Sequence, residues 1–487
     1  MGKFSTYRYL ELKDDTSSSH INVRARSLKQ PRRFKKVFIF LLVLALCGTY
    51  LLEVAGLRIV GSEMTNATAP VVRVLPVLIA GLFAGQTQWF DGLAKSLGYE
   101  SVYHHAVIID AGSSGSRVLA YKFRVPFTVF GQANLDLVDE YFEESKPGLS
   151  SYVDDPKKGA ETIVQLIKKA EFLTPPEKRK STPLVVRATA GLRLLPAMKA
   201  QMLIKEVADA IAKLGYDVGP NGVEIMDGSD EGIFIWYTVN LLHNLIGGET
   251  MAAMDLGGGS TQITYQLQES DRKQYAPGDQ FVVPAGENIT LYTHSFLKLG
   301  LLAARHGVFK LEAGDNDTDE FVSVCVDPIV QKEKWIYANR QYSISGAPRP
   351  DGMKREAVYS RCASLVSRYI ARTLDRAPRA PRGNVAAMSY FYDVAADAGL
   401  IDVMTGGRVS VGAYRSAARR ACSASNVEQP WACVDLTYIV ALLHDAYTMK
   451  DDESVSLFKK VNGHEVSWAL GLAYTTVMNK ITAAPAA

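Results

Sequence analysis

One short pattern occurs twice in the chain and constrains its fold more than any other feature. AVIIDAGSSGSR (residues 106–117) and AAMDLGGGSTQI (residues 252–263) each pass from apolar residues to an aspartate and then to glycine with serine or threonine. Asp110 and Asp255 occupy the same place in the two copies. One such turn is common, but two that each follow a strand predict a duplicated α/β domain.

The two copies are suited to binding phosphate and a metal ion. Glycines let the backbone turn tightly and bring its N–H groups close to an anion, and serine and threonine hydroxyls add neutral donors. An aspartate at the end of a strand is well placed to hold a divalent cation, directly or through water. The repeat therefore predicts a site that grips a polyphosphate and a metal ion between two halves.

Two further segments lie between the copies. Residues 185–196 run from a strand into a glycine turn that carries Thr189 and Arg193. Arg193 either neutralises phosphate or forms a surface ion pair. Residues 227–242 are typical of a helix, which we expect Ser229 to cap. By its position alone, Glu231 either complements the positive end of that helix or takes part in the site.

The pattern beyond residue 103 is α/β. Short runs rich in β-branched residues, such as 184–186 and 251–254, alternate with amphipathic helical stretches, such as 160–172 and 199–214. This alternation predicts largely parallel sheets, with ligands at the carboxyl ends of the strands.

The front of the chain predicts a membrane anchor. Residues 37–52 are uncharged and mostly apolar and follow a basic segment, so the positive-inside rule leaves residues 1–36 in the cytosol. We expect an anchor at 37–57 and a stem at 58–102; a cleaved signal peptide is the alternative. The balance of 54 basic and 51 acidic residues predicts no nucleic-acid partner.

Cysteines and sequons agree with that orientation. Cys47 falls inside the anchor, and an even number of cysteines beyond it predicts two disulfides in an oxidising compartment, with three connectivities open. These cysteines are Cys325, Cys362, Cys422 and Cys433. The expected glycosylation sites beyond the anchor are Asn66, Asn288 and Asn316.

Five segments, in this order, resemble the five signature regions of the apyrase family, the nucleoside triphosphate diphosphohydrolases. They are DAGSSGSR, ATAGLRLLP, SDEGIFIWYTVNLL, DLGGGSTQITY and SWALGLAY, and the resemblance runs from about residue 104 to 475. YTHSFLKLGL (residues 292–301) and SYFYDVAADAGLID (residues 389–402) carry further similarity to the family. The single N-terminal anchor, GSDEG and the few luminal cysteines resemble the nucleoside diphosphatase branch of the endoplasmic reticulum and Golgi.

The resemblance implies a fold. It is that of the actin, Hsp70 and sugar-kinase superfamily, an α/β architecture of two RNase H-like domains around a central cleft, preceded here by one transmembrane helix. The first domain would take residues 103–190 and 440–487, and the second residues 191–439. The implied disulfides are Cys325–Cys362 and Cys422–Cys433.

The resemblance also implies roles for residues. Glu231 resembles the catalytic base, Ser260 and Gln262 would orient the attacking water, and Asp110 and Asp255 would hold Ca²⁺ or Mg²⁺ through water, with Mn²⁺ a further candidate. The phosphate-binding residues would be Ser113, Ser114, Gly115, Ser116, Thr189, Arg193, Gly257, Gly258 and Gly259. Tyr390 and Tyr392 are candidates to stack on the nucleobase, although a core role for one of them is equally compatible with the sequence.

The expected activity is metal-dependent hydrolysis of the terminal phosphate of nucleoside diphosphates such as UDP and GDP in the secretory lumen, in support of glycosylation. The expected location is the Golgi or endoplasmic reticulum membrane, type II, with a secreted form possible after cleavage in the stem. One alternative is an exopolyphosphatase or guanosine pentaphosphatase; another is a catalytically silent luminal protein that binds nucleotide. Gly115, where many relatives carry a larger polar residue, leaves the choice between di- and triphosphates open, and the base and the oligomeric state are open too.

Overall fold

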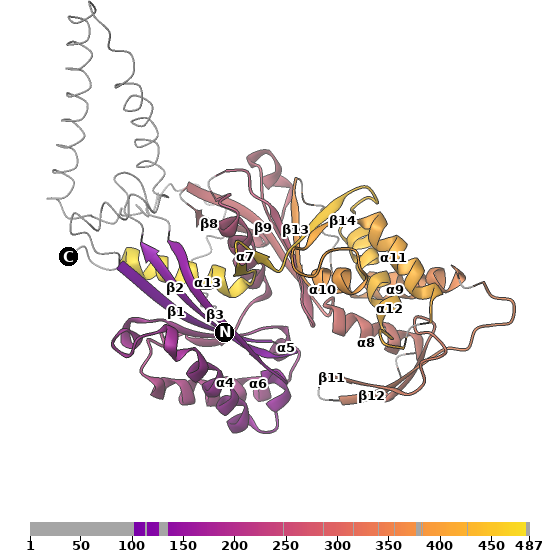
Figure 1. Cartoon of the computed structure of the whole chain (residues 1–487), viewed down its shortest axis with the longest axis horizontal. Coiled ribbons are helices and arrows are strands. Elements are labelled where there is room, and N and C mark those ends of the chain that lie inside the picture. The colour runs from indigo at the N-terminus through magenta and orange to yellow at the C-terminus, as the bar shows by residue number, and fades with distance from the viewer. Residues whose placement is uncertain are drawn as a thin grey trace, which may run out of the picture. The chain divides into compact units, whose positions relative to one another are not determined.

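A computed structural model of the chain describes residues 102–483, apart from residues 113, 126–134, 247, 286, 315, 339, 355, 376–380, 382 and 426 (Figure 1). The predicted cytosolic tail, the anchor and the stem as far as residue 101 lie outside the described residues, as do Asn66 and Ser113. Within the described part, no helix has the length and apolar character needed to cross a membrane.

The described chain divides into two compact units. The larger contains Ala106–Ala120 and Glu140–Ala473, and the smaller contains the residues up to His105, Tyr121–Asp139 and the end of the chain from Tyr474. Every described residue predicted for the catalytic, phosphate, metal or base site belongs to the larger unit. The predicted domain boundaries near residues 190 and 440 stay a prediction.

The first sheet carries the first Asp–Gly copy. Its strand order is β3-β2-β1-β4-β5, with β1 at Val102–Ala111, β2 at Ser116–Val125, β3 at Asp136–Ser145, β4 at Leu184–Ala188 and β5 at Val223–Ile225. Strands β1, β4 and β5 run parallel, and Asp110 lies opposite Arg187. Helices α4 (Pro156–Ala170) and α6 (Ala197–Ile211) contribute apolar residues to the same core as these strands.

The second sheet carries the second copy. Its order is β14-β15-β13-β6-β7-β9-β8, with β6 at Ala252–Leu256, β7 at Ser260–Gln266, β8 at Gln280–Ala285, β9 at Glu287–Leu297, β13 at Val385–Ser389, β14 at Gly407–Ser410 and β15 at Ser454–Leu457. Strand β6 runs parallel to β13 and antiparallel to β7. The two copies are therefore the short connections β1–β2 and β6–β7, and each first strand lies between its hairpin partner and a parallel strand.

The prediction of largely parallel sheets is wrong for the second sheet. The pairs β6–β7, β7–β9, β8–β9 and β14–β15 are antiparallel, and only β13 pairs with its neighbours in parallel. The reason is local: a loop as short as residues 257–259 can join only antiparallel neighbours, because a parallel connection needs a crossover. Glycine and serine after a strand here lead into a hairpin, not into a helix.

Helices cover the second sheet and supply part of the site. They are α7 (Gly228–Leu242), α8 (Leu301–Glu312), α9 (Glu356–Thr373), α10 (Tyr390–Asp397), α11 (Val411–Ser423) and α12 (Ala432–Ala441) (Figure 1). The disulfides are Cys325–Cys362 and Cys422–Cys433, as the resemblance implied. The second of them joins α11 to α12 directly. Asn316 is exposed, and the backbone of Asn288 lies in β9, opposite Pro284.

Candidate active site

The first half of the candidate site surrounds Asp110, at the end of β1. Arg117, on β2, donates from Nη1 to Asp110 Oδ2 at 3.1 Å, and its Nη2 lies 2.8 Å from Glu144 Oε1 on β3. Asp110 Oδ1 is buried and has no hydrogen-bond partner among the described residues, which do not include Ser113 of the same loop. Burial raises the pKa of Asp110, and the Arg117 charge opposes that shift. This half therefore offers a buried acceptor atom that protein donors leave free.

The first loop packs tightly against β3. A Cβ on Gly115 would lie 2.7 Å from Glu144 Oε1 and 3.2 Å from the carbonyl oxygen of Ser145, so no larger residue fits without movement. Ser116 is buried, and its Oγ accepts from the backbone N–H of Leu149 at 3.1 Å. A side chain at position 115 would therefore have to displace the carboxylate of Glu144, which is paired with Arg117.

The second half surrounds Asp255, at the corresponding place in β6. Ser389 Oγ donates to Asp255 Oδ1 at 2.6 Å. Burial raises the pKa of Asp255 to about 6; the Ser389 hydrogen bond opposes the shift, and the charge of Asp110 adds to it. The influence of Asp110 on this pKa means that the two aspartates are near enough for their charges to interact.

The N-terminal turn of α8 holds the second glycine loop. The N–H of Leu301 donates to the carbonyl of Gly257, and the N–H of Ala303 to that of Gly258, both at 2.9 Å. The N–H of Lys298 donates to the carbonyl of Gly259 at 2.8 Å. These bonds fix the direction of all three peptide groups of the loop.

Glu231 lies in the first turn of α7, between the two halves in sequence. The cap of this helix is Asp227, whose carboxylate accepts from the N–H of Ser229 at 2.8 Å, so the prediction that Ser229 is the cap is wrong. An aspartate two residues earlier reaches the free N–H groups of the first turn, and Ser229 is already inside the helix. The helix lies directly on β7 and β9, because a Cβ on Gly232 would lie 2.6 Å from the hydroxyls of Thr264 and Thr293.

The predicted catalytic residues form one hydrogen-bonded cluster. Glu231 Oε2 accepts from Arg193 Nη2 at 2.6 Å and from Gln262 Nε2 at 3.0 Å. Gln262 Nε2 also lies 2.8 Å from Ser260 Oγ and 3.0 Å from Ser295 Oγ. Gln262 Oε1 is buried and has no hydrogen-bond partner in the described part of the chain. The cluster therefore fixes the amide of Gln262 by its nitrogen and leaves its oxygen available to a ligand.

The electrostatic environment gives Glu231 a pKa suited to a base that acts at neutral pH. Burial raises the pKa of Glu231 to about 7; the Arg193 charge opposes the shift, while the charges of Asp255 and Asp110 add to it. A carboxylate with this pKa accepts protons efficiently near neutral pH. The residues Glu231, Asp255 and Asp110 are each only 5 to 7% exposed, so bulk water does little to screen their mutual repulsion.

Not every residue predicted for the site joins this cluster. Thr189 follows β4, and its N–H donates to the carbonyl of Ala111 at 3.3 Å, which places it beside the first loop. Tyr392 is a core residue whose hydroxyl donates to the carbonyl of Val403 at 2.8 Å. Tyr390 is only partly buried, and the charge of Arg117 is among the smaller influences on its pKa, which burial raises. Tyr390 is therefore the better placed of the two aromatic candidates.

Four residues of the candidate site were not assigned a role from the sequence. They are Arg117, Glu144, Ser295 and Ser389. Arg117, Ser295 and Ser389 lie inside segments that carry the family resemblance, DAGSSGSR, YTHSFLKLGL and SYFYDVAADAGLID, so their place in those segments was an available signal. Glu144 had no such signal.

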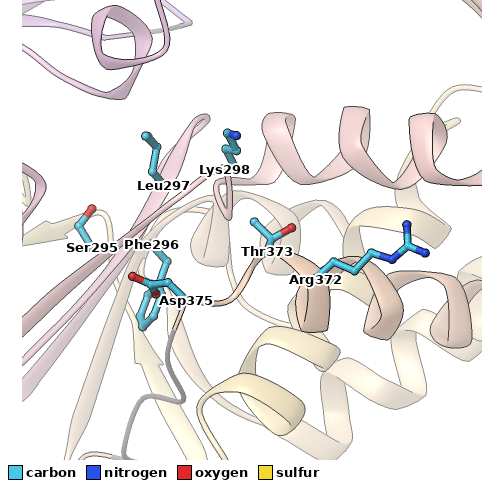
Figure 2. Close-up of a pocket in the computed structure, with 7 residues that line it drawn as sticks. All are labelled: Ser295, Phe296, Leu297, Lys298, Arg372, Thr373 and Asp375. Carbon is cyan, nitrogen blue, oxygen red and sulfur yellow. The ribbon is translucent and has the colours of Figure 1, made fainter. Parts of the chain in front are cut away.

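A cavity of about 390 Å³ opens between the end of β9 and the C-terminal end of α9 (Figure 2). Its lining residues are Ser295, Phe296, Leu297, Lys298, Arg372, Thr373 and Asp375. Only Ser295 belongs to both this cavity and the cluster around Glu231. None of the residues that line the cavity is among those predicted to bind phosphate.

Two Asp–Gly hairpins in similar sheets, with a buried glutamate hydrogen-bonded to a glutamine and an arginine, define an α/β phosphohydrolase. The chain belongs to the GDA1/CD39 (nucleoside phosphatase) family, which matches residues 98–484. The predicted membership of the apyrase family is thereby confirmed, and it favours this interpretation over the exopolyphosphatase alternative.

Relatives and a solved structure agree with this assignment. The chain is 38% identical over 406 residues to the human protein named nucleoside diphosphate phosphatase ENTPD5, covering 80% of this chain and 92% of that one. It is 34% identical to nucleoside-diphosphatase uda-1 of Caenorhabditis elegans, covering 76% of this chain and 81% of that one. A nucleoside triphosphate hydrolase from Neospora caninum matches with a TM-score of 0.56 at 15% identity, over 79% of this chain and 94% of that one, which confirms the α/β fold of a nucleotide phosphatase.

Proposed function

We propose that the chain hydrolyses the terminal phosphate of nucleoside diphosphates, giving the monophosphate and inorganic phosphate. The observation that carries the proposal is Glu231, a buried carboxylate with a pKa of about 7 that is oriented by Arg193 and Gln262. The similarity to proteins named for nucleoside diphosphatase activity supports the diphosphate as substrate.

In the proposed reaction, Glu231 accepts a proton from water as the water oxygen attacks the terminal phosphorus. The bond from that phosphorus to the bridging oxygen breaks, and the nucleoside monophosphate leaves with the electron pair. Gln262, through its unpartnered Oε1, and Ser260 orient the water. Arg193 keeps the carboxylate of Glu231 in place and contributes positive charge beside the reacting phosphate.

The carboxylates fit a divalent cation. Asp110 and Asp255 are buried and repel each other, and Asp110 Oδ1 has no partner within the described residues; a cation would relieve this repulsion. Within the described residues, no three His, Cys, Asp or Glu side chains group closely enough to hold a metal ion. Two carboxylates with water and substrate phosphate are typical of Mg²⁺ sites. When bound, Ca²⁺ or Mg²⁺ would neutralise charge on the phosphate oxygens.

The wider setting is part of the proposal. The basic segment before residues 37–52, the disulfides and the exposed sequon at Asn316 support a type II membrane protein of the Golgi or endoplasmic reticulum whose catalytic part faces the lumen. Two RNase H-like domains around a cleft, which hold the nucleotide with Tyr390 against its base, complete the proposed arrangement. Removal of the UDP or GDP that glycosyltransferases release would be its use.

A nucleotide panel tests the proposal. Full-length protein in detergent is offered UDP, GDP, IDP, ADP, CDP, UTP, ATP and inorganic polyphosphate with Mg²⁺ or Ca²⁺, and phosphate release is measured. We expect a preference for one or more diphosphates. A preference for polyphosphate would contradict the proposal, and nucleotide binding without phosphate release would identify a silent binding protein.

A further inference from the structure

Ser389 has an unusual backbone conformation at the edge of the candidate site. It is the last residue of β13 and directly precedes α10, and its φ and ψ are 58° and −126°. Residues with a Cβ rarely adopt a positive φ, and such positions concentrate where function requires them. A serine held in this conformation therefore calls for a specific reason.

The hydroxyl of Ser389 does not serve the helix that it precedes. A serine before a helix usually has an extended backbone and accepts a hydrogen bond from the first turn. Ser410 does this for α11: its φ and ψ are −81° and 156°, and its Oγ accepts from the N–H of Ala413 at 3.1 Å. The side chain of Ser389 makes no such bond to α10 and instead donates to Asp255 Oδ1 at 2.6 Å.

The corresponding place in the first sheet has no hydroxyl. Ser389 lies opposite Leu256, one residue after Asp255 in β6, just as Ala188 lies opposite Ala111, one residue after Asp110 in β1. The strand pairs are otherwise equivalent, since each aspartate has a parallel neighbour on this side. The contact from Ser389 is therefore a feature of the second half alone and does not follow from the repeated architecture.

We infer that Ser389 is a positioning residue that holds the carboxylate of Asp255 in the orientation that receives the divalent cation. By occupying Oδ1, the hydroxyl fixes the plane of the carboxylate and so the direction of Oδ2. The Asp255 backbone is fixed as well, because Thr261 Oγ1 donates to its carbonyl at 2.7 Å. The inference rests on the proposed metal role of Asp255, and such outer partners commonly change metal affinity by about 10- to 100-fold.

The test measures metal binding directly, with Mn²⁺ as the probe. Mn²⁺ is titrated into full-length protein in detergent with a non-hydrolysable UDP analogue, bound ion is followed by electron paramagnetic resonance, and Tm is recorded. We expect Ser389→Ala and Ser389→Gly each to weaken Mn²⁺ binding about 10- to 100-fold. Ser389→Gly should keep or raise Tm, because glycine tolerates φ of 58°.

Ser410→Ala is the matched control. It removes a serine from the same position before a helix, so it should lower Tm and leave Mn²⁺ affinity unchanged. Unchanged Mn²⁺ affinity in both Ser389 variants would overturn the inference, as would a fall in Tm for Ser389→Gly that accounts for its loss of binding. If Asp255→Asn binds Mn²⁺ as tightly as the wild type, the proposed metal role of Asp255 is wrong. If Asp255→Asn weakens Mn²⁺ binding and the Ser389 variants do not, only the positioning role of Ser389 is wrong.

Discussion

Asp110 and Asp255 occupy equivalent backbone positions but are held by different chemistry. Asp110 pairs with a cation, Arg117, which is itself shared with Glu144. Asp255 accepts from the neutral hydroxyl of Ser389 and has no cation among its hydrogen-bond partners in the described part of the chain. The repeated hairpin thus determines where each carboxylate lies, while unrelated side chains determine its charge balance. Duplication of a fold does not duplicate the electrostatics of its site.

Glu231→Gln should have the largest effect, because Glu231 is the proposed proton acceptor of the reaction. The substitution keeps the shape and removes the proton acceptor, so we expect kcat to fall by about 100- to 10,000-fold. Steady-state phosphate release measures this, together with binding of a non-hydrolysable UDP analogue, which should persist. Asp230→Asn, at the neighbouring position in the same helix turn, is the control. Turnover at the wild-type rate in Glu231→Gln would remove this residue from its proposed role.

Asp110→Asn and Asp255→Asn compare the two halves directly. If both aspartates hold the same cation, each substitution should raise the Mg²⁺ concentration for half-maximal activity by about 10- to 100-fold. Chelation with EDTA should stop wild-type turnover. Asp209→Asn, which removes an exposed carboxylate paired with Lys205 on α6, should leave the Mg²⁺ requirement unchanged. An effect of only one of the two aspartates would show that a single half binds the metal.

Arg117→Gln removes the cation that distinguishes the first half. The charge of Arg117 lowers the pKa of both Asp110 and Asp255, so its loss should raise both pKa values and leave less of each carboxylate ionised at acidic pH. We expect a loss of about 10-fold in kcat/KM near pH 7, greater at pH 6 than at pH 8. Arg124→Gln, in the same strand and paired with Asp136, is the control. An equal loss at every pH would contradict this explanation.

The smallest expected effect is on stability. Burial raises the pKa of Glu231 from 4.5 to about 7 and that of Asp255 from 3.8 to about 6. The folded state therefore binds more protons than the unfolded state up to about pH 7, and its stability falls as pH rises through that range. Metal-free protein should have a lower Tm at pH 8 than at pH 6, by the equivalent of about 1 to 3 kcal/mol. Saturating Mg²⁺ should reduce this difference in Tm. A higher Tm at pH 8 than at pH 6 in metal-free protein would contradict the raised pKa values of Glu231 and Asp255.

The sequence predicted the chemistry-bearing residues better than their surroundings. The two Asp–Gly copies could be recognised locally, each as a glycine turn after a strand, whereas the roles of Glu231, Ser260 and Gln262 were implied by the family resemblance. In the structure these three side chains form one hydrogen-bonded group. The prediction of largely parallel sheets was wrong for the second sheet, because glycine and serine after a strand can lead either into a hairpin or into a helix. The partners Ser389 and Glu144 were missed because their contacts depend on which strands lie next to one another.

The partner of Arg193 also could not be predicted from the sequence. Its position at a strand end predicted either a phosphate ligand or a surface ion pair, and its observed partner is the buried carboxylate of Glu231, 38 positions along the chain. Nothing in the local pattern around Arg193 encodes a contact that depends on α7 lying against β7 and β9. Sequence reasoning identified a residue of the site and left its partner open.

The two disulfides have a consequence for how oxidation stabilises the molecule. They close loops with separations of 37 and 11 residues, and both fall between Cys325 and Cys433 in the sequence. Such crosslinks act largely by reducing the freedom of the unfolded chain, at about 3 kcal/mol for a loop of 15 residues. A reductant should therefore lower Tm by removing the crosslinks at α9, α11 and α12, even though none of the four cysteines is part of the proposed site.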